Sequence, residues 1–255
     1  MSKKYKLGIA LSGGGSKGFA HAGALKALEE FGYKPDIIAG TSAGAITAAL
    51  YSAGYAPHEI CQLFDHKGFT DFTRITLPTA GFFSPQKFVD FLRAKIPYQN
   101  IEDLPIPVRI VSTDLDNGVI KVFDEGSIAE RVMASSNVPV VFPPMLIDGI
   151  HYVDGGVFCN FPVSVIRQEC EVVIGINVSP LAATQYKQTM LEIANRAFDF
   201  MFRANTKEDG KLCDILIEMT EVLKYDTFNL DSIAEIFELG YTQTKKVLEE
   251  QAYLR

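Results

Sequence analysis

Short runs of branched apolar residues alternate along this chain with longer segments that carry apolar residues at helical spacing. Four of the runs have the composition of strands buried inside a parallel sheet, at 7–11, 36–39, 108–112 and 172–178. Helical segments follow the first two runs, at about 19–30 and 44–53, and Gly32 and Gly54 stand where these helices should end. The alternation predicts an α/β fold with a mostly parallel central sheet and helices on both of its faces.

Two local signals refine this prediction. The dipeptide Asp148-Gly149 is a two-residue turn sequence between apolar segments, and it predicts an antiparallel β-hairpin within residues 145–153. Ser127 and Glu130 have the spacing of a capping box, which predicts the start of a helix. The hairpin is therefore expected as an addition to the parallel sheet.

Residues 55–105 fit the alternation less well, because they are rich in phenylalanine and interrupted by prolines. Helices are expected near 57–66 and 85–95, the second with Ser84 as its N-cap and Pro85 at its first helical position. We expect this region to form a helical, aromatic-rich layer over or beside the sheet.

The chain has no repeat, low-complexity tract or linker, so a single domain over 1–255 is predicted. A helix over 187–203 is apolar on nearly every face, which is typical of a helix enclosed in a core. Enclosure in the core, contact with a second copy of the chain and contact with a lipid surface are the three alternatives for this helix.

Composition excludes several classes of protein. A chain of 255 residues, 47% hydrophobic, can bury a large core. Its net charge of −7, without a basic stripe, argues against nucleic-acid binding. The four cysteines form no CxxC pair, so we expect ordinary thiols in a reducing compartment. The basic N-terminus leads into a strand rather than a signal peptide, and no window approaches the roughly 18 apolar residues of a membrane span, so a cytoplasmic protein is expected.

The first expected strand runs into a glycine-rich loop that opens the first helix. The loop satisfies the G-x-G-x-x-G pattern of dinucleotide sites. It consists of Gly13, Gly14, Gly15, Ser16, Lys17 and Gly18. A dinucleotide site requires an acid at the end of the second strand, and Gly40 stands there instead. What remains is a row of backbone N–H groups at a helix N-terminus, which suits negative charge of any kind. A tight turn without a ligand is the alternative.

A second glycine-rich turn joins the second strand to the second helix. It consists of Gly40, Thr41, Ser42, Ala43 and Gly44. The pattern G-x-S-x-G between a strand and a helix is the context of a nucleophile elbow, in which a strained turn lifts the serine hydroxyl clear of the sheet. Ser42 is therefore the candidate nucleophile, and it needs a base to take its proton.

No histidine in the sequence is well placed to be that base. In the Ser…Asp…His order of α/β-hydrolases only His151 could serve, but the elbow comes too early in the chain for that fold. His21 lies just behind the first glycine loop, where we expect it to brace the loop. The other candidate is Asp154, which precedes Gly155 and Gly156 at the end of the expected hairpin strand. For Asp154, a plain turn aspartate is the alternative.

The motifs GGGSKG, GTSAG and DGG, in that order, resemble the patatin-like phospholipase family. Two further segments agree with this resemblance. Residues 112–115 are similar to the T-D-L segment of the family, and residues 134–144 are similar to its A-S-x-x-x-P…F-x-P block. The resemblance covers about residues 5–180, whereas residues 181–255 resemble the family only loosely.

The resemblance implies a serine–aspartate dyad without a histidine, with Ser42 as the nucleophile and Asp154 as the base. It also implies an oxyanion hole made by backbone N–H groups of Gly14 and Gly15, with Ala43 as a further candidate donor. The implied reaction is hydrolysis of fatty acyl esters through an acyl-serine intermediate. The implied partner is an acyl lipid, with a transient membrane-surface contact and a homodimer as further expectations, and neither metal nor cofactor is expected. A non-catalytic regulatory member of the family and a nucleotide-binding module are the alternatives.

Overall fold

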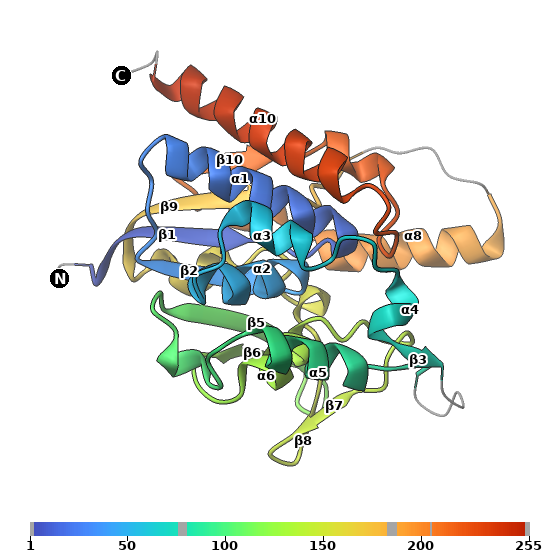
Figure 1. The fold of residues 1–255 in the computed structure, drawn as a ribbon. Helices are drawn as coiled ribbons and strands as arrows, with labels where there is room; N and C mark the ends of the chain where they lie inside the picture. The colour runs from blue at the N-terminus through green and yellow to red at the C-terminus, as the bar shows by residue number, and fades with distance from the viewer. Residues whose placement is uncertain (1–2, 76–80, 183–187, 205, 253–255) are drawn as a thin grey trace.

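The computed structural model describes residues 3–75, 81–182, 188–204 and 206–252, and its centre is an eight-stranded sheet (Figure 1). The strand order is β10-β9-β1-β2-β5-β8-β7, and β6 also pairs with β5. The strands are β1 (Tyr5–Leu11), β2 (Ile37–Thr41), β5 (Val108–Asp114), β6 (Val119–Phe123), β7 (Met145–Ile147), β8 (Ile150–Asp154), β9 (Cys170–Asn177) and β10 (Ile215–Glu218).

The adjacent strands β10, β9, β1, β2 and β5 pair in parallel, whereas β6, β7 and β8 are antiparallel additions. This arrangement confirms the mostly parallel sheet and the added hairpin. The hairpin turn residues Asp148 and Gly149 have φ values of 51° and 83°, as a two-residue turn of this sequence requires. The sequence pattern does not predict β6, which is mostly exposed, or β10, which has only four residues.

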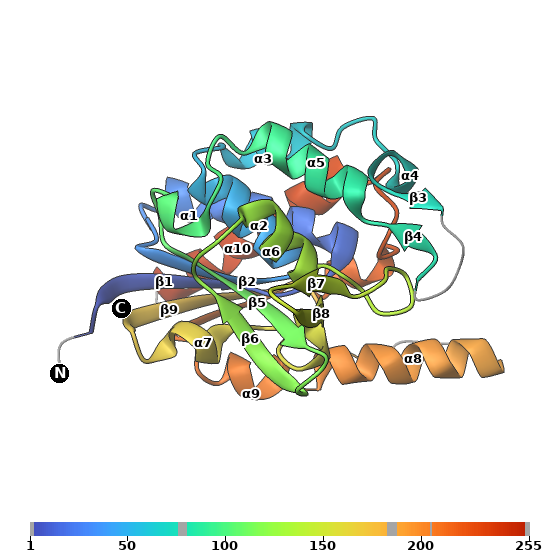
Figure 2. The same cartoon turned by 90° about the horizontal axis from the view of Figure 1, so that it is seen from below.

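Helices cover both faces of the sheet, as the pattern predicts (Figure 2). One face carries α1 (Phe19–Glu30), α2 (Ala43–Ser52), α3 (Pro57–Gln62), α5 (Gln86–Lys95), α6 (Ile128–Ser135) and α10 (Ile233–Ala252), and the other carries α7 (Val163–Arg167) and α9 (Thr206–Gly210). Successive side chains of β1 point to opposite faces of the sheet. Ile9 and Leu11 belong to the larger core on the first face, while Ala10 packs with Val163 and Ile166 on the second.

Residues 55–105 contribute α3, α5, the short helix α4 (Phe69–Phe72) and a two-stranded sheet of β3 (Arg74–Ile75) and β4 (Phe83–Ser84). Their phenylalanine rings contact one another. The ring of Phe64 lies 5.4 Å from the rings of Phe72 and Phe91, measured between centroids. The helix predicted at 57–66 ends at Gln62, before the aromatic contacts begin.

One predicted helix cap is wrong and a second is confirmed only in its position, although both helices exist. Ser84 belongs to β4, and Pro85 is the N-cap of α5 rather than its first helical residue. Ser127 precedes α6 as predicted, but its side chain makes no capping hydrogen bond. The carboxylate of Glu130 instead pairs with Arg93 of α5 at 2.8 Å, so an ion pair between helices replaces the expected capping box.

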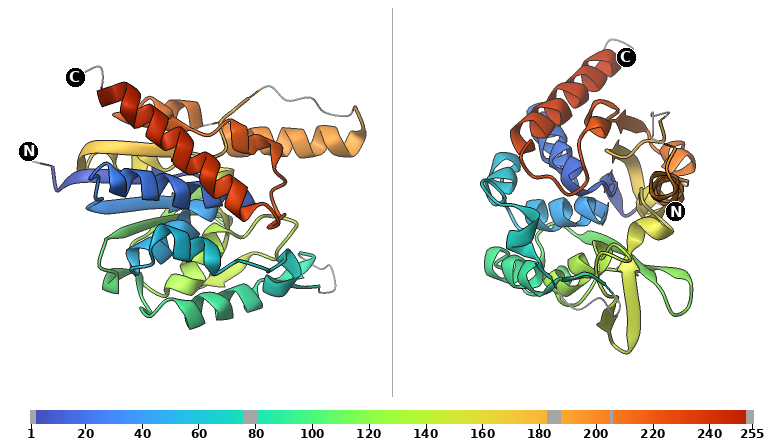
Figure 3. Two further views of the ribbon diagram at one scale, coloured as in Figure 1. Left: turned by 45° about the horizontal axis from the view of Figure 1, so that its top comes forward. Right: turned by 90° about the vertical axis from the view of Figure 1, so that its right-hand side faces the viewer.

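Helix α8 (Met190–Arg203) extends away from the rest of the molecule (Figures 1 and 3). The start predicted at position 187 lies outside the described residues. Met190 is 88% exposed, and Ile193, Phe200 and Met201 are also exposed. Enclosure in the core is therefore wrong for these four side chains, because α8 projects beyond the layers that could cover it. Contact with a second copy or with a lipid surface stays a prediction.

Candidate active site

Strands β2 and β8 approach the same point of the sheet from opposite directions. β2 runs parallel to β5 and ends with Thr41 opposite Val111. β8 runs antiparallel to β5 and ends with Asp154 opposite Ser112. Because β6 pairs with the other edge of β5 over residues 110–114, β2 and β8 share one edge and meet end to end. This topology brings Asp154 to the elbow that follows Thr41.

Ser42 occupies a strained turn at the N-terminus of α2. Its φ of 52° and ψ of −120° lie outside the regions that serine ordinarily adopts. A Cβ on Gly40 would lie 2.6 Å from the backbone nitrogen of Ala45, and one on Gly44 would lie 2.8 Å from the carbonyl oxygen of Ser12. Both positions therefore require glycine, because neighbouring backbone comes too close for any side chain.

The buried hydroxyl of Ser135 holds the backbone of Ser42 in this conformation. Ser135 Oγ accepts a hydrogen bond from the Ser42 N–H at 2.8 Å and donates one to the Val111 carbonyl at 2.5 Å. Helix α6 thereby fastens the elbow to β5. In the sequence, Ser135 is visible only inside a segment that resembles a family motif, and no local pattern reveals this contact.

Asp154 is buried against the elbow, with only 1% of its surface exposed. Its carboxylate accepts hydrogen bonds from the Gly156 N–H, at 2.7 Å, and from the Ser42 hydroxyl. Burial raises the pKa of Asp154 to about 7, and these two hydrogen bonds only partly oppose the rise. A carboxylate that titrates near neutral pH accepts a proton more readily than an ordinary aspartate, which is what a general base requires.

The residues next to Ser42 and Asp154 in the sequence have structural roles that account for their place in the two motifs. Thr41 Oγ1 donates to the Cys159 carbonyl at 2.9 Å, which ties the end of β2 to the chain after β8. A Cβ on Gly155 would lie 2.7 Å from the carbonyl carbon of Val111, so this position also needs glycine. Gly156 supplies the N–H that holds Asp154.

The first glycine loop lies beside Ser42 and presents two backbone donors. Gly13 and Ser16 donate their N–H groups to backbone carbonyls at 2.9 and 2.8 Å. Within the described residues, the N–H groups of Gly14 and Gly15 have no acceptor, and both glycines line the cavity that contains Ser42. Donors of this kind are available to an oxyanion that develops next to the serine.

The histidines lie away from the serine hydroxyl. His21 is buried, and its ring Nε2 lies 2.8 Å from the Ser12 carbonyl oxygen, so it braces the loop as predicted. Burial lowers the pKa of His21 to about 4, which leaves its ring neutral near pH 7. His151 is half-exposed on the hairpin, and His58 and His66 are exposed. Across the ranges that the structure describes, no histidine lines the cavity.

The candidate groups open into a cavity of about 610 Å³, a size typical of small-molecule sites. Polar side chains of its lining include Ser42, Asp154, Ser16 and Lys17, and Ala43 and Gly18 also line it. Apolar side chains from α2, α6 and the aromatic layer form much of the rest, among them Ile46, Phe64, Phe69, Phe72, Phe88 and Met133. The arrangement offers a nucleophile and a base in the wall of a largely apolar chamber.

Sequence comparison identifies the family. The model of the family described as patatin-like phospholipase matches residues 9–166. This chain belongs to the patatin-like phospholipase family. It is 33% identical to patatin-like phospholipase domain-containing protein 7 of Mus musculus over 279 residues, which cover 95% of this chain and 20% of that protein. It is 34% identical to an uncharacterized NTE family protein of Mycobacterium tuberculosis over 172 residues, which cover 65% of this chain and 46% of that protein.

The solved structure of VipD from Legionella pneumophila has a similar fold, with a TM-score of 0.60 over 98% of this chain and 67% of that chain. At 16% identity this likeness concerns the fold alone. The matched regions span less than half the length of both curated relatives. Family membership supports lipid acyl hydrolysis in general terms.

Proposed function

We propose that this chain is a serine acyl hydrolase that cleaves fatty acyl esters of lipids, with Ser42 as the nucleophile and Asp154 as the base. The observation that carries the proposal is the buried contact between these two side chains, in which burial raises the pKa of Asp154 to about 7. A base of this kind removes the need for a histidine. The apolar cavity beside it supports an acyl chain as the bound group.

In the acylation step, Ser42 Oγ attacks the ester carbonyl carbon while its proton passes to the Asp154 carboxylate. The carbonyl oxygen becomes an oxyanion, which accepts hydrogen bonds from the N–H groups of Gly14 and Gly15. The tetrahedral intermediate then collapses and the bond to the leaving alcohol breaks. The alcohol takes the proton from Asp154, and an acyl-serine remains.

In the deacylation step, water gives a proton to Asp154 and attacks the acyl-serine carbonyl. The same two N–H groups stabilise the second oxyanion. When this intermediate collapses, the fatty acid leaves and Ser42 Oγ recovers its proton from Asp154. Because the base must be ionised, kcat/KM should rise with pH through about 7.

The substrate reaches the site from a lipid phase in this proposal. Within the described part of the chain, no helix combines the length and apolarity needed to cross a membrane. The exposed apolar side chains of α8 support a transient contact with a lipid surface, with Met190, Ile193 and Met201 as the contacting residues. A homodimer formed through the same face is the alternative, and a cytoplasmic location stays a prediction.

Labelling with a serine-directed fluorophosphonate tests the proposal, together with hydrolysis of acyl esters of graded chain length. The wild-type protein should be labelled and active, and Ser42→Ala should be neither. Ser52→Ala is the matched control, because Ser52 ends the helix that follows Ser42 and does not line the cavity. A folded wild-type protein that is neither labelled nor active would favour the non-catalytic or nucleotide-binding alternative. A thermal shift with NAD or ATP would then separate these two.

A further inference from the structure

A short segment near the C-terminal end of the described chain, residues 226–230, lies against the first glycine loop. Ser16 donates its N–H to the Thr227 carbonyl at 2.8 Å and its hydroxyl to the Asp226 carbonyl at 2.6 Å. Lys17 Nζ lies 3.3 Å from Thr227 Oγ1, to which it donates. We call residues 226–230 the strap. It joins the short helix η4 (Glu221–Lys224) to α10.

The backbones of the loop and the strap also meet at Gly15. The φ of Gly15 is 60°, and a Cβ there would lie 3.1 Å from the carbonyl carbon of Thr227. Both the left-handed conformation and the close approach favour glycine at this position. The residue that follows Gly14 and Gly15, Ser16, is held to the strap by two hydrogen bonds. The free N–H groups of the two glycines therefore lie directly next to this attachment.

The strap also forms part of the cavity wall. Phe228 and Leu230 line the cavity, and the centroid of the Phe228 ring lies 5.0 Å from that of Phe69 in the aromatic layer. One segment thus touches both the loop that carries the candidate oxyanion donors and the layer that encloses the apolar chamber.

We propose that the strap is a positioning and specificity element of the active site. It orients the N–H groups of Gly14 and Gly15 through Ser16, and the ring of Phe228 contacts the acyl chain of the substrate. This inference rests on the proposed hydrolase function. The match to the family model ends at residue 166, so the strap lies in a part of the chain that the match does not cover.

The variant Ser16→Ala tests the positioning role, because it removes one bond to the strap and leaves every backbone donor in place. We expect kcat to fall about tenfold and KM to stay within about twofold, since displaced donors weaken binding of the transition state and not of the acyl chain. The control is Ser52→Ala, whose buried hydroxyl has no partner within the described residues, and it should keep the wild-type kcat. A loss of kcat no larger than the loss of folded protein would overturn this role.

The variant Phe228→Ala tests the specificity role with a decanoyl and a butyryl ester of the same alcohol. The ratio of kcat/KM for the longer ester to that for the shorter one should fall about fivefold, because the longer chain loses apolar contact area. Phe31→Ala is the control, since Phe31 is exposed at the end of α1 and does not line the cavity. An unchanged ratio in Phe228→Ala would overturn this role.

Amide hydrogen exchange separates this inference from the proposed function, because it needs no substrate. Amides of residues 12–18 should exchange at least about tenfold faster in Ser16→Ala than in the wild type, since local opening costs less without the strap bond. Equal exchange would show that the strap does not hold the loop, whatever the activity. An inactive, unlabelled wild type would instead contradict the proposed function alone.

Discussion

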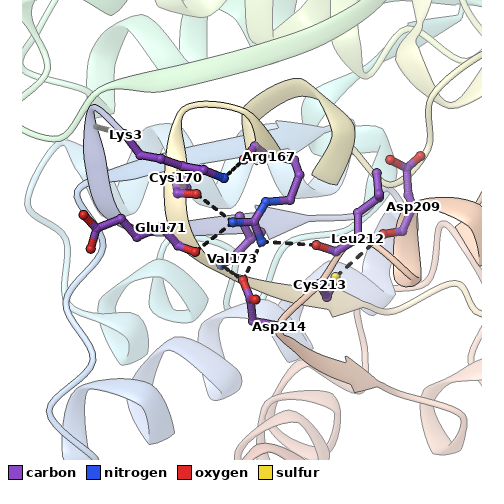
Figure 4. Close-up of polar contacts among 9 residues, drawn as sticks. All are labelled: Lys3, Arg167, Cys170, Glu171, Val173, Asp209, Leu212, Cys213 and Asp214. Carbon is purple, nitrogen blue, oxygen red and sulfur yellow. Dashed lines mark hydrogen bonds and ion pairs between the residues drawn. The ribbon is translucent and has the colours of Figure 1, made fainter. Parts of the chain in front are cut away.

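Asp154 ends strand β8 and Arg167 ends helix α7, and hydrogen bonds satisfy these two polar side chains to very different extents. Asp154, at the elbow, has one backbone donor and the Ser42 hydroxyl. Arg167 lies near the amino ends of β9 and β10, and its guanidinium donates to one carboxylate and three backbone carbonyls (Figure 4). Its acceptors are Asp214, Leu212, Cys170 and Glu171.

The pKa values of Asp154 and Asp214, the aspartates of these two regions, shift in opposite directions. Burial acts to raise the pKa of Asp214, but the Val173 N–H and the Arg167 guanidinium outweigh it and hold that pKa below its usual value. Burial of Asp154 is opposed too weakly, and its pKa rises to about 7. The four hydrogen bonds of Arg167 tie α7, β9 and β10 together. The fewer donors at Asp154 leave a carboxylate that readily accepts a proton.

The matched variants Asp154→Asn and Asp214→Asn should separate the two regions most strongly in activity. We expect Asp154→Asn to lower kcat at least about a thousandfold, because an amide cannot take the proton of Ser42. Asp214→Asn should keep kcat within about twofold, because it touches no group of the site. Ester hydrolysis by protein of verified folding measures both. An Asp154→Asn variant that keeps a tenth or more of the wild-type rate would contradict the assigned base.

The same two variants should change stability in opposite directions. Asp154 loses its proton near pH 3.8 when unfolded and near 7 when folded, so its contribution to stability falls as pH rises through about 7. Asp154→Asn should therefore raise the free energy of unfolding at pH 8 by up to about 4 kcal/mol, and by less at pH 5.

The contribution of Asp214 to stability depends on pH in the opposite way. Its pKa is lowered in the folded state, so the ionised carboxylate stabilises the protein at pH values above its unfolded pKa. Asp214→Asn should lower the free energy of unfolding at pH 8 by about 1 kcal/mol, since solvent screens this half-exposed carboxylate. Urea denaturation at pH 5 and pH 8 measures both variants. A loss of stability at pH 8 in both would remove the contrast between the two regions.

Gly14, near the elbow, and Gly8, near Arg167, allow the two regions to be compared by their packing. A Cβ on Gly14 would lie 2.6 Å from Val178 Cγ2, so Gly14→Ala should shift the loop and lower kcat about a hundredfold. Adding Val178→Ala should restore most of that loss, because it frees the space. In the Arg167 region, a Cβ on Gly8 would lie 2.9 Å from Ile166 Cδ1. Gly8→Ala should therefore lower the free energy of unfolding by about 1–3 kcal/mol and leave the kcat of the folded protein unchanged.

Thermal unfolding and ester hydrolysis, measured on the same preparations, distinguish these outcomes. A Gly14→Ala variant with normal kcat would mean that the loop does not supply the oxyanion donors. A Gly8→Ala variant with reduced kcat would mean that the amino ends of the strands influence the site.

The sequence predicts those parts of the site that depend on residues adjacent to one another in the chain. The pattern G-x-S-x-G between a strand and a helix predicts the elbow at Ser42. The Asp148-Gly149 turn predicts the hairpin whose second strand is β8. The contacts of Ser135 with Ser42 and of Ser16 with Asp226 join residues 93 and 210 positions apart. Each depends on one hydroxyl group, which produces no periodic pattern along the chain.

The errors in the predicted fold have a related physical origin. Strand β6 is mostly exposed and β10 is short, so neither has the apolar run that marks a buried strand. Helix α8 has the apolar composition of an enclosed helix, but enclosure depends on which other elements reach it. Composition therefore indicates how apolar an element is, and only the tertiary arrangement decides whether it is covered.

His151→Gln should have the smallest effect, and it tests whether the base is the aspartate alone. His151 lies on β8 with Asp154, but its Nδ1 lies 3.1 Å from the Asp116 carboxylate and its side chain is half-exposed. We expect the rate of fluorophosphonate labelling and kcat to stay within about twofold, with the rise of kcat/KM near pH 7 unchanged, because Asp154 carries that titration. His58→Gln, at an exposed position in α3, is the control. If well-folded His151→Gln lost its labelling while His58→Gln kept it, the base would include a histidine, and the incomplete pairing of Asp154 would serve to orient that histidine instead of accepting the serine proton.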